Sequence, residues 1–394
     1  MKKTIQMLQE FSIPLIAGVF AALIWANISP HSYHELMETE LIFGANFHFL
    51  VNDIFMVFFF AIAGVEITQS LMPGGDLNPL KKAINPLLAT IGGVVGPVAV
   101  YLGLNAVFGS PELVRGWGIP TATDIALAWL VARFVFGAAH PAVKFLLLLA
   151  IADDAIGLVI IAVFYPDPLQ PAEPIWLLLV LAAVIVAFAL RKFNVRNYWP
   201  YLLVAGLLSW TGLHNTHLHP ALALVFIVPF LPHPVTARGH LFEAEEEEEE
   251  HSTLARFEHE WKVIVDFGLF FFGLSNAGVQ LSGIGAATWL VFVGLLLGKT
   301  VGIVTLANLG KLVGFPLPEG MGQKELFTAA LVAALGLTVA LFVAGAAFVD
   351  PSIQGAAKMG ALFSGFVAIL ALAVGKMLGI RKINEEATPV VEEH

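Results

Sequence analysis

The sequence predicts an all-α membrane protein with twelve transmembrane helices. Composition, a series of long apolar runs and the distribution of basic residues lead to this class. Of the 394 residues, 58% are hydrophobic and 13% are charged, whereas an average soluble domain carries about 25% charged residues. This excludes nucleic-acid-binding and disordered proteins. The sequence contains no Cys, which excludes disulfide scaffolds, thiolate metal sites and cysteine nucleophiles.

A helix that spans a bilayer needs about 20 mostly apolar residues. Twelve such runs occur, and they are continuous rather than alternating, which argues against a β-barrel. The first run follows Lys2 and Lys3 without a clear cleavage site, so we expect a retained helix rather than a signal peptide. The runs lie near residues 11–29, 45–67, 84–108, 118–136, 142–165, 174–192, 198–214, 218–232, 263–281, 287–309, 326–349 and 359–380.

Basic residues are distributed unevenly among the connections between these runs. In membrane proteins, Lys and Arg gather on the cytoplasmic side. If the N-terminus is cytoplasmic, only Arg115 and Lys358 fall in connections on the opposite side, and Lys299 lies within a span. The sequence therefore predicts that both termini are cytoplasmic.

Residues 1–383 are predicted to form a single transmembrane domain. Within it, residues 233–262 form an acidic segment with an uninterrupted run of Glu at 245–250. This segment is interpreted as a solvated cytoplasmic loop, or alternatively as a loop that attracts cations or regulates activity. Residues 384–394 form an acidic tail that is predicted to be disordered.

A few ionisable residues fall within the apolar runs. A charge at the centre of a bilayer costs about 3 kcal/mol on insertion scales, so such residues usually pair, line water or move an ion. Asp266 has a second interpretation as a charge near the cytoplasmic interface, because it follows Lys262 by four residues. The intramembrane ionisable residues are Asp53, Glu66, Asp124, Asp153, Asp154, Asp266 and Lys299.

Asp153 and Asp154 lie about ten residues into the fifth run, near the middle of the bilayer. Adjacent residues point about 100° apart on a helix, so one carboxylate can face a neighbouring helix while the other faces water. Close carboxylates repel each other, which favours the binding of a proton or a cation. The alternative is a salt-bridged pair that only stabilises the fold, but Lys299 is the single base within the spans.

The fourth and eleventh runs are predicted to be interrupted helices. The fourth contains Gly118-Ile119-Pro120-Thr121-Ala122-Thr123-Asp124, where Pro120 breaks the helix. The eleventh is interrupted at Gly336-Leu337-Thr338. Paired interruptions indicate a transporter site, and runs 3–5 and 10–12 are candidate inverted repeats with crossing broken helices. The alternative for the fourth run is a simple kink with Asp124 as its cap.

These motifs together resemble the NhaA family of Na+/H+ antiporters over most of the chain. Two adjacent acids, a Thr-Asp in an interrupted span and one later Lys occur in the family's order. The resemblance is carried by Trp117 to Ala126, Ala150 to Asp154, Asn276 to Val279 and Gly298-Lys299, with further matches at Asn52-Asp53, Gly64 to Glu66, Trp210-Thr211, His219 with Leu222-Ala223, and Leu317 to Gly320.

The resemblance implies a role for each matching residue. Asp154 is the expected main carboxylate for the cation and the proton, and Asp153 is its partner, so Na+ is expected at these two residues. Asp153 is also expected to pair with Lys299 in the ion-free state. Asp124 and Lys299 are expected to compensate the dipoles of the broken helices. Thr123 is expected to take part in the ion site, and Thr121, Gly336 and Thr338 are expected to line the broken helices.

The chain departs from the family pattern on the expected cytoplasmic face. Thr68, Gln69 and Ser70 replace charged positions after the second span, and no second His follows His259. These departures concern the pH response rather than the ion site. The residues that the resemblance connects with a pH response are Glu66, His219, Glu258 and His259, and His219 has an alternative interpretation as a helix-end residue without a titrating role.

The resemblance implies electrogenic export of Na+ or Li+ in exchange for a larger number of protons, which serves sodium and pH homeostasis. It also implies a homodimer in the bacterial inner membrane, with no cofactor and no nucleic-acid partner. A Na+-coupled symporter of an organic solute and a channel are the alternatives among transport proteins. We do not expect an enzyme, because the motifs of intramembrane aspartyl proteases, membrane prenyltransferases and serine proteases are absent.

Overall fold

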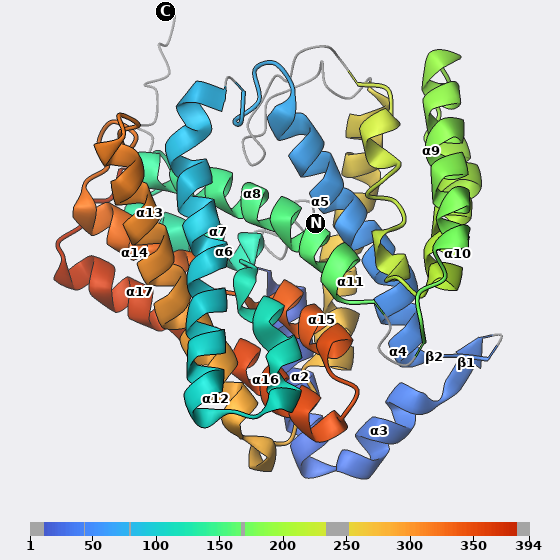
Figure 1. Ribbon diagram of the computed structural model, residues 1–394, viewed down its shortest axis with the longest axis horizontal. Helices are drawn as coiled ribbons and strands as arrows, with labels where there is room; N and C mark the ends of the chain where they lie inside the picture. Colours follow the sequence, from blue (N-terminus) through green and yellow to red (C-terminus); the bar gives the residue numbers. More distant parts are fainter. Residues whose placement is uncertain (1–11, 43, 79, 167–169, 234–251, 384–394) are drawn as a thin grey trace, which may run out of the picture.

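The computed structural model describes residues 12–42, 44–78, 80–166, 170–233 and 252–383. The Glu run at 245–250 and the tail at 384–394 lie outside the described residues. Most of the described residues are helical. The sheet among them is a two-stranded antiparallel hairpin of β1 (Glu40–Ile42) and β2 (Ala45–Asn46). The all-α prediction is therefore confirmed (Figure 1).

Six helical spans are long and apolar enough to cross a bilayer. Three of them contain a π-helical turn or a short 3-10 turn at one end or within the span. The six spans are Phe47–Leu71, with α4 (Phe47–Phe49), η1 (Leu50–Phe55) and α5 (Met56–Leu71); Ala83–Phe108 within α6 (Leu80–Phe108); α8 (Pro141–Phe164); Pro174–Lys192, with η3 (Pro174–Trp176) and α9 (Leu177–Lys192); Ala286–Leu312, with α12 (Ala286–Val293), η9 (Gly294–Lys299) and α13 (Thr300–Leu312); and Pro351–Met377, with α16 (Pro351–Phe363) and α17 (Phe366–Met377).

Two further spans are broken, at the positions that the sequence predicts. The first consists of the 3-10 helix η2 (Pro111–Thr121) and α7 (Ile125–Phe136), which meet at a bend of 54°. The second consists of α14 (Gln323–Ala333) and α15 (Leu337–Ala347), bent by 45°. Each pair lies between two long spans in the chain, so the two three-span units have the same order of elements.

The remaining predicted runs are shorter or less regular. The first is α2 (Ile13–Ile28), and the seventh is η4 (Tyr201–Gly206) with α10 (Leu207–Thr216). The ninth, α11 (Thr253–Asn276), begins ten residues before the expected span and includes the end of the segment predicted as a loop. A short helix, α3 (Pro30–Glu38), follows α2, and η8 (Leu281–Gly283) follows α11.

The eighth predicted run, 218–232, departs from a regular helix. It contains two 3-10 turns, η5 (Pro220–Leu222) and η6 (Val228–Phe230), joined by further turns. Several backbone N–H groups in this segment bond to carbonyls three residues earlier. An α-helix through this segment would need the N–H of Pro229, which proline lacks.

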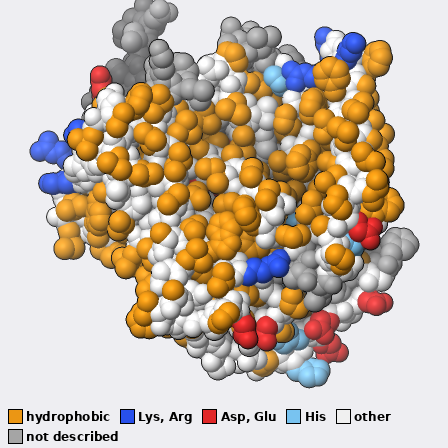
Figure 2. Space-filling model, viewed as in Figure 1, with side chains coloured by type: hydrophobic (Ala, Val, Ile, Leu, Met, Phe, Trp, Pro, Cys, Tyr) orange, Lys and Arg blue, Asp and Glu red, His pale blue; other side chains and the backbone are white. Residues whose placement is uncertain are grey.

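The outer surface is apolar, as a bilayer requires. Figure 2 shows a face covered mostly by hydrophobic side chains, with many of the charged side chains toward its edges. Large apolar side chains such as Phe20, Leu181 and Phe188 are more than half exposed. Inside this layer, α8 packs against α5, α6, α7 and α14, so the helix that carries Asp153 and Asp154 lies among both broken spans.

Candidate ion site at the crossing of the broken helices

The two broken spans contact each other at their breaks. The Asp124 N–H donates to the Leu335 carbonyl at 2.6 Å, and the Thr123 hydroxyl donates to the Ala333 carbonyl at 2.9 Å. Non-helical backbone at membrane depth is tolerated where it is buried in protein and its polar groups are paired. Each break therefore supplies hydrogen-bond partners for the other.

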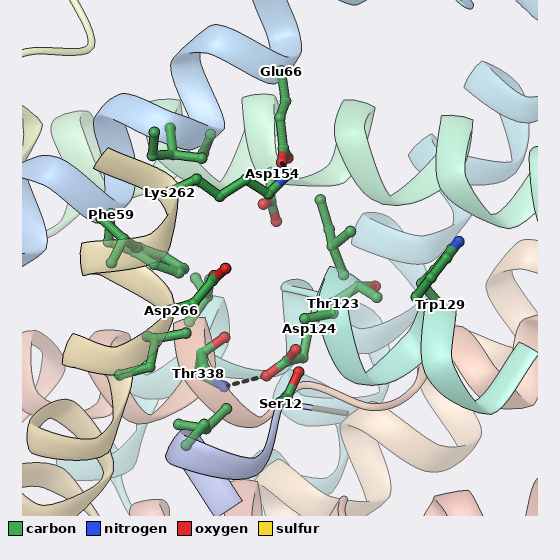
Figure 3. A pocket seen from close by; sticks show the side chains of 18 of the residues that line it. Ser12, Phe59, Glu66, Thr123, Asp124, Trp129, Asp154, Lys262, Asp266 and Thr338 are labelled. Carbon is green, nitrogen blue, oxygen red and sulfur yellow. Dashed lines mark hydrogen bonds and ion pairs between the residues drawn. The ribbon is translucent and has the colours of Figure 1, made fainter. Parts of the chain in front are cut away.

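Asp124 contacts the first turn of two helices. It is the N-cap of α7, where its Oδ1 accepts a hydrogen bond from the Leu127 N–H at 3.1 Å. Its Oδ2 accepts from the Thr338 N–H of α15 at 3.2 Å (Figure 3). Helix N-termini carry partial positive charge and unpaired N–H groups. One carboxylate thus lies where both half-helices favour a negative charge.

Gly336 lies in close contact with the backbone of the other break. A Cβ placed on Gly336 would lie 2.8 Å from the Ala122 carbonyl oxygen and 2.7 Å from a methyl of Leu295. The Gly336 N–H donates to the Ser364 hydroxyl at 3.2 Å. The sequence marks Gly336 as an interruption, and the structure adds that this position has no room for a side chain. Ser364 was not identified from the sequence.

Lys299 and Asp153 form an ion pair whose side chains are completely buried. The Lys299 Nζ lies 2.6 Å from Asp153 Oδ2. The same ammonium donates to the Thr121 carbonyl, at the C-terminal end of η2. Carbonyls at a helix C-terminus lack intrahelical partners and carry partial negative charge. Lys299 therefore contacts both a carboxylate and the negative end of a half-helix.

The position of Lys299 depends on a close contact between α6 and the η9–α13 span. A Cβ on Gly96 would lie 2.2 Å from the Gly298 carbonyl oxygen, and a Cβ on Gly302 would lie 2.0 Å from the Gly92 carbonyl oxygen. Small residues four apart allow membrane helices to approach this closely. Gly298 stands out in the sequence only as the neighbour of Lys299, and Gly92, Gly96 and Gly302 were not identified from it, although the four-residue spacing was a readable signal.

Asp154 faces a cavity of about 530 Å³, while the neighbouring Asp153 faces Lys299. Figure 3 shows Asp154 across the cavity from Asp124, with Thr123 beside Asp124 and Thr338 joined to Asp124 by a hydrogen bond. One oxygen of Asp154 is buried and has no hydrogen-bond partner within the part of the chain that the structure describes. The two adjacent carboxylates therefore have different surroundings.

Four charged residues gather where α5 and α11 border this cavity. The Lys262 Nζ lies 3.9 Å from Glu66 Oε1 and 3.8 Å from Glu258 Oε1. Asp266, one turn after Lys262, also lines the cavity and interacts electrostatically with Lys262 and Glu66. The structure thus places Asp266 on the wall of the cavity that Asp154 also lines.

His219 lies in a different cavity, of about 510 Å³, together with Asp53, His214 and His217. Its Nδ1 accepts from the Ala221 N–H at 3.4 Å, and its ring lies 4.4 Å from that of Phe342. Across the described residues, no group of three or more His, Asp or Glu is arranged to hold a metal ion. The histidines of this cavity therefore do not form such a group.

Comparison with known proteins identifies the family. Residues 2–381 match the family described as Na+/H+ antiporter 1. The Na(+)/H(+) antiporter NhaA of Geobacter sulfurreducens is 66% identical over 383 residues, covering 97% of this chain and 100% of the relative. The chain belongs to the NhaA family of Na+/H+ antiporters.

Further comparisons agree with the NhaA assignment. The Na(+)/H(+) antiporter NhaA of Desulfitobacterium hafniense is 64% identical, covering 98% of each chain. The solved sodium proton antiporter MjNhaP1 of Methanocaldococcus jannaschii has a TM-score of 0.52 at 15% identity, covering 94% of this chain and 92% of that chain. The MjNhaP1 comparison concerns the fold alone and agrees with it. Membership of the antiporter family, together with the apolar spans, identifies a multi-pass membrane transporter.

Thr68, Gln69 and Ser70, the uncharged residues at which this chain departs from the family pattern, lie in the last turn of α5. The Thr68 and Ser70 hydroxyls donate to carbonyls of the same helix, whereas Gln69 contacts α11. Gln69 Nε2 donates to Glu258 Oε2 at 2.7 Å, next to Lys262. His259 is exposed on α11 and does not line the cavity. Among the residues considered for a pH response, Glu66 and Glu258 thus share one cluster, whereas His219 and His259 lie elsewhere.

Proposed function

We propose that this chain exports Na+ or Li+ in exchange for a larger number of protons, through one transporter domain spanning residues 1–383. Asp154 is the main carboxylate for both ions and Asp153 is its partner. The observation that supports this proposal best is that the two adjacent carboxylates have different partners. Asp154 lines the cavity, whereas Asp153 pairs with Lys299. Membership of an antiporter family supports the same ions.

Competition for Asp154 supplies the coupling. A carboxylate that carries a proton has lost the charge that attracts Na+, so the proton-bound and cation-bound states exclude each other. If the site opens to one side of the membrane at a time, each exchange moves the two ions in opposite directions. No cofactor is required for this cycle.

Asp153 and Lys299 extend the site by a charge exchange. In the observed state the Lys299 ammonium neutralises Asp153. A Na+ bound between Asp153 and Asp154 would supply the positive charge that Lys299 supplies without it. Lys299 would then leave Asp153, and the Asp153 carboxylate would become free to bind the cation. The Lys299 contact with the Thr121 carbonyl gives the ammonium a second partner in the same place.

The broken helices hold this arrangement inside the membrane. Asp124 compensates the N-termini of α7 and α15, and Lys299 compensates the C-terminal end of η2. Thr123 and Thr338 line the same cavity as Asp154 and offer hydroxyl oxygens to a cation. A small change in the crossing angle would therefore move charged and polar groups together.

The membrane potential contributes to export. If one net positive charge enters per cycle, a potential of 100 mV supplies about 2.3 kcal/mol. We place the protein in the bacterial inner membrane as a homodimer with both termini in the cytoplasm, on the basis of the positive-inside rule and the family. Glu66, Glu258, His259 and His219 remain candidates for the pH response. Membership of the antiporter family does not support the symporter alternative.

Proton movement in everted vesicles from a bacterial host that lacks its own antiporters tests this function. Vesicles are made acid-inside, and Na+, Li+ or K+ is added across a pH series. Na+ and Li+ should dissipate the gradient in the wild type, K+ should not, and Asp154→Asn should abolish the response. Collapsing the membrane potential should slow the exchange if it is electrogenic.

Glu112→Gln is the matched control, because Glu112 is an exposed acid at the start of η2, away from the cavity. It should transport like the wild type. A well-expressed wild type without Na+-dependent proton movement at any pH would overturn the proposal. Full activity of Asp154→Asn would overturn the role of that carboxylate alone.

A further inference from the structure

The basic side chain of Lys262 lies beside the candidate ion site. It borders the cavity that contains Asp154, and its ammonium lies within 4 Å of carboxylate oxygens of Glu66 and Glu258. Figure 3 shows its side chain reaching from α11 toward Glu66 and Asp154. A positive group of this protein is thus held at carboxylates along the wall that leads to the ion site.

The carboxylates around Lys262 are partly desolvated. The side chain of Glu66 is 12% exposed and that of Glu258 is 17% exposed, whereas Lys262 retains 30% exposure. Gln69 holds the second oxygen of Glu258 at 2.7 Å, which fixes that carboxylate in place. Charges in such surroundings interact more strongly than charges in bulk water. The ammonium therefore affects the potential that an approaching cation experiences.

Asp266 lies one turn further along α11 and lines the same cavity. It interacts electrostatically with both Lys262 and Glu66. Two residues of opposite charge, on one face of one helix, therefore border the route to Asp154. Their effects on a cation that enters this cavity must have opposite signs.

We propose that Lys262 is a tethered competitor of Na+ and sets the apparent affinity for Na+ that reaches Asp154 from the cytoplasmic cavity. Its ammonium occupies the carboxylates that a cation would otherwise meet first, and it repels the cation until the side chain moves aside. Asp266 acts in the opposite sense by attracting the cation. This inference rests on the proposed Na+/H+ exchange and concerns a positioning residue, not the carrier carboxylates.

The test measures the KM for Na+ and the maximal rate in proteoliposomes, at one fixed pH, with Na+ offered separately from each side. Lys262→Met should lower the KM on the cytoplasmic side by about threefold or more, the size expected for one partly screened charge pair. Asp266→Asn should raise it by a similar factor. The maximal rate and the KM from the opposite side should change little, and Lys262→Arg should behave like the wild type.

Arg256→Met is the matched control. Arg256 is another cation on α11, but it pairs with Glu260 at the surface and does not line the cavity. The KM of the Arg256→Met variant for Na+ should equal that of the wild type. General damage to α11 would shift Lys262→Met and Asp266→Asn in the same direction, whereas electrostatic control shifts them in opposite directions.

The outcomes separate this inference from the proposed function. If wild type transports and Lys262→Met leaves the KM unchanged or raises it, the competitor role is overturned while the antiport function stands. If both substitutions raise the KM, the cluster is structural and the inference fails. If the wild type shows no Na+-dependent proton movement, the proposed function itself fails.

Discussion

Asp153 and Lys299 are joined by a 2.6 Å contact with no exposed surface on either side chain. Asp153 comes from α8 and Lys299 from the end of η9, which are far apart in sequence. The Lys299 ammonium also donates to the Thr121 carbonyl. This pair links two of the long spans to the first broken span, so its strength bears on both stability and transport.

Removal of Lys299 should be strongly destabilising. Lys299→Met leaves the Asp153 carboxylate buried without its cation, and breaking a buried pair typically costs about 3–5 kcal/mol. The midpoint of thermal unfolding in detergent should therefore fall clearly. The double variant with Asp153→Asn should recover most of the loss, because no unpaired charge remains.

The matched control for this pair is Lys311→Met. Lys311 is an exposed residue near the end of α13, the helix that continues from η9. The Lys311→Met variant should unfold at the same temperature as the wild type. If the Lys299→Met and Lys311→Met variants were equally stable, the buried ion pair between Asp153 and Lys299 would not contribute to stability.

Asp124 should be more sensitive to Ala than to Asn. Asn retains one oxygen that can cap a helix, whereas Ala leaves the N-termini of both α7 and α15 without their acceptor. Loss of a cap costs about 0.5–2 kcal/mol for each helix. Unfolding temperature and Na+-driven proton movement should both fall in the order wild type, Asp124→Asn, Asp124→Ala.

Asp350→Ala provides the comparison for Asp124. Asp350 is also an N-cap, of α16, and accepts from the Ser352 and Ile353 N–H groups, but it is exposed and remote from the cavity. Its loss should leave the transport rate unchanged. Equal transport by Asp124→Ala and Asp350→Ala would argue against a special position for Asp124.

Gly96 should not accept even a methyl group. Its Cβ would lie 2.2 Å from the Gly298 carbonyl, so Gly96→Ala must separate α6 from the span that carries Lys299. Overpacking of this kind costs about 1–3 kcal/mol. Thermal unfolding should show the loss, and transport should fall because Lys299 is displaced.

Gly103→Ala is the control on the same helix. Nothing lies within 4 Å of a Cβ at Gly103, which is exposed in α6. Replacing Gly by Ala inside a helix is neutral or favourable by up to about 1 kcal/mol. A similar loss of stability in both variants would show that the cause is not the contact between α6 and the η9–α13 span.

His140 should make stability depend on pH. Its Nδ1 accepts from the Ala142 N–H at 3.0 Å as the N-cap of α8, and only a neutral imidazole can accept. Burial lowers the pKa of His140, and the negative charge of Glu325 opposes this effect in part. The unfolded chain therefore binds more protons than the folded protein as pH falls through the ordinary histidine range near 6.5.

The stabilising effect of His140 should thus be complete above that pH range and should be lost as the medium becomes more acidic. Unfolding temperature across a pH series is the measurement. His140→Asn keeps a capping oxygen without a titrating ring, so its curve should be flatter on the acid side. His31→Asn, at an exposed histidine of α3, should retain the wild-type slope.

Much of the fold could be predicted because each signal was local. Long apolar runs give membrane helices whatever their neighbours are, and Pro120 and Gly336 mark breaks by their own backbone chemistry. The adjacent acids Asp153 and Asp154 stood out because charges are rare in apolar runs. The run at 218–232 is less regular than the other spans, and hydropathy alone does not report that its backbone forms short 3-10 turns.

What the sequence by itself determined is the class of protein, the positions of the two breaks and the charged residues that need partners. Only the tertiary structure decided which partners they have. In the folded protein Asp153 pairs with Lys299, and Asp154 lines the cavity. Asp124 accepts hydrogen bonds from the first turns of two helices. Asp266 lines the same cavity as Asp154. The reason is physical: apolarity is a property of each residue, whereas a charge pair depends on the distance between segments that the sequence separates.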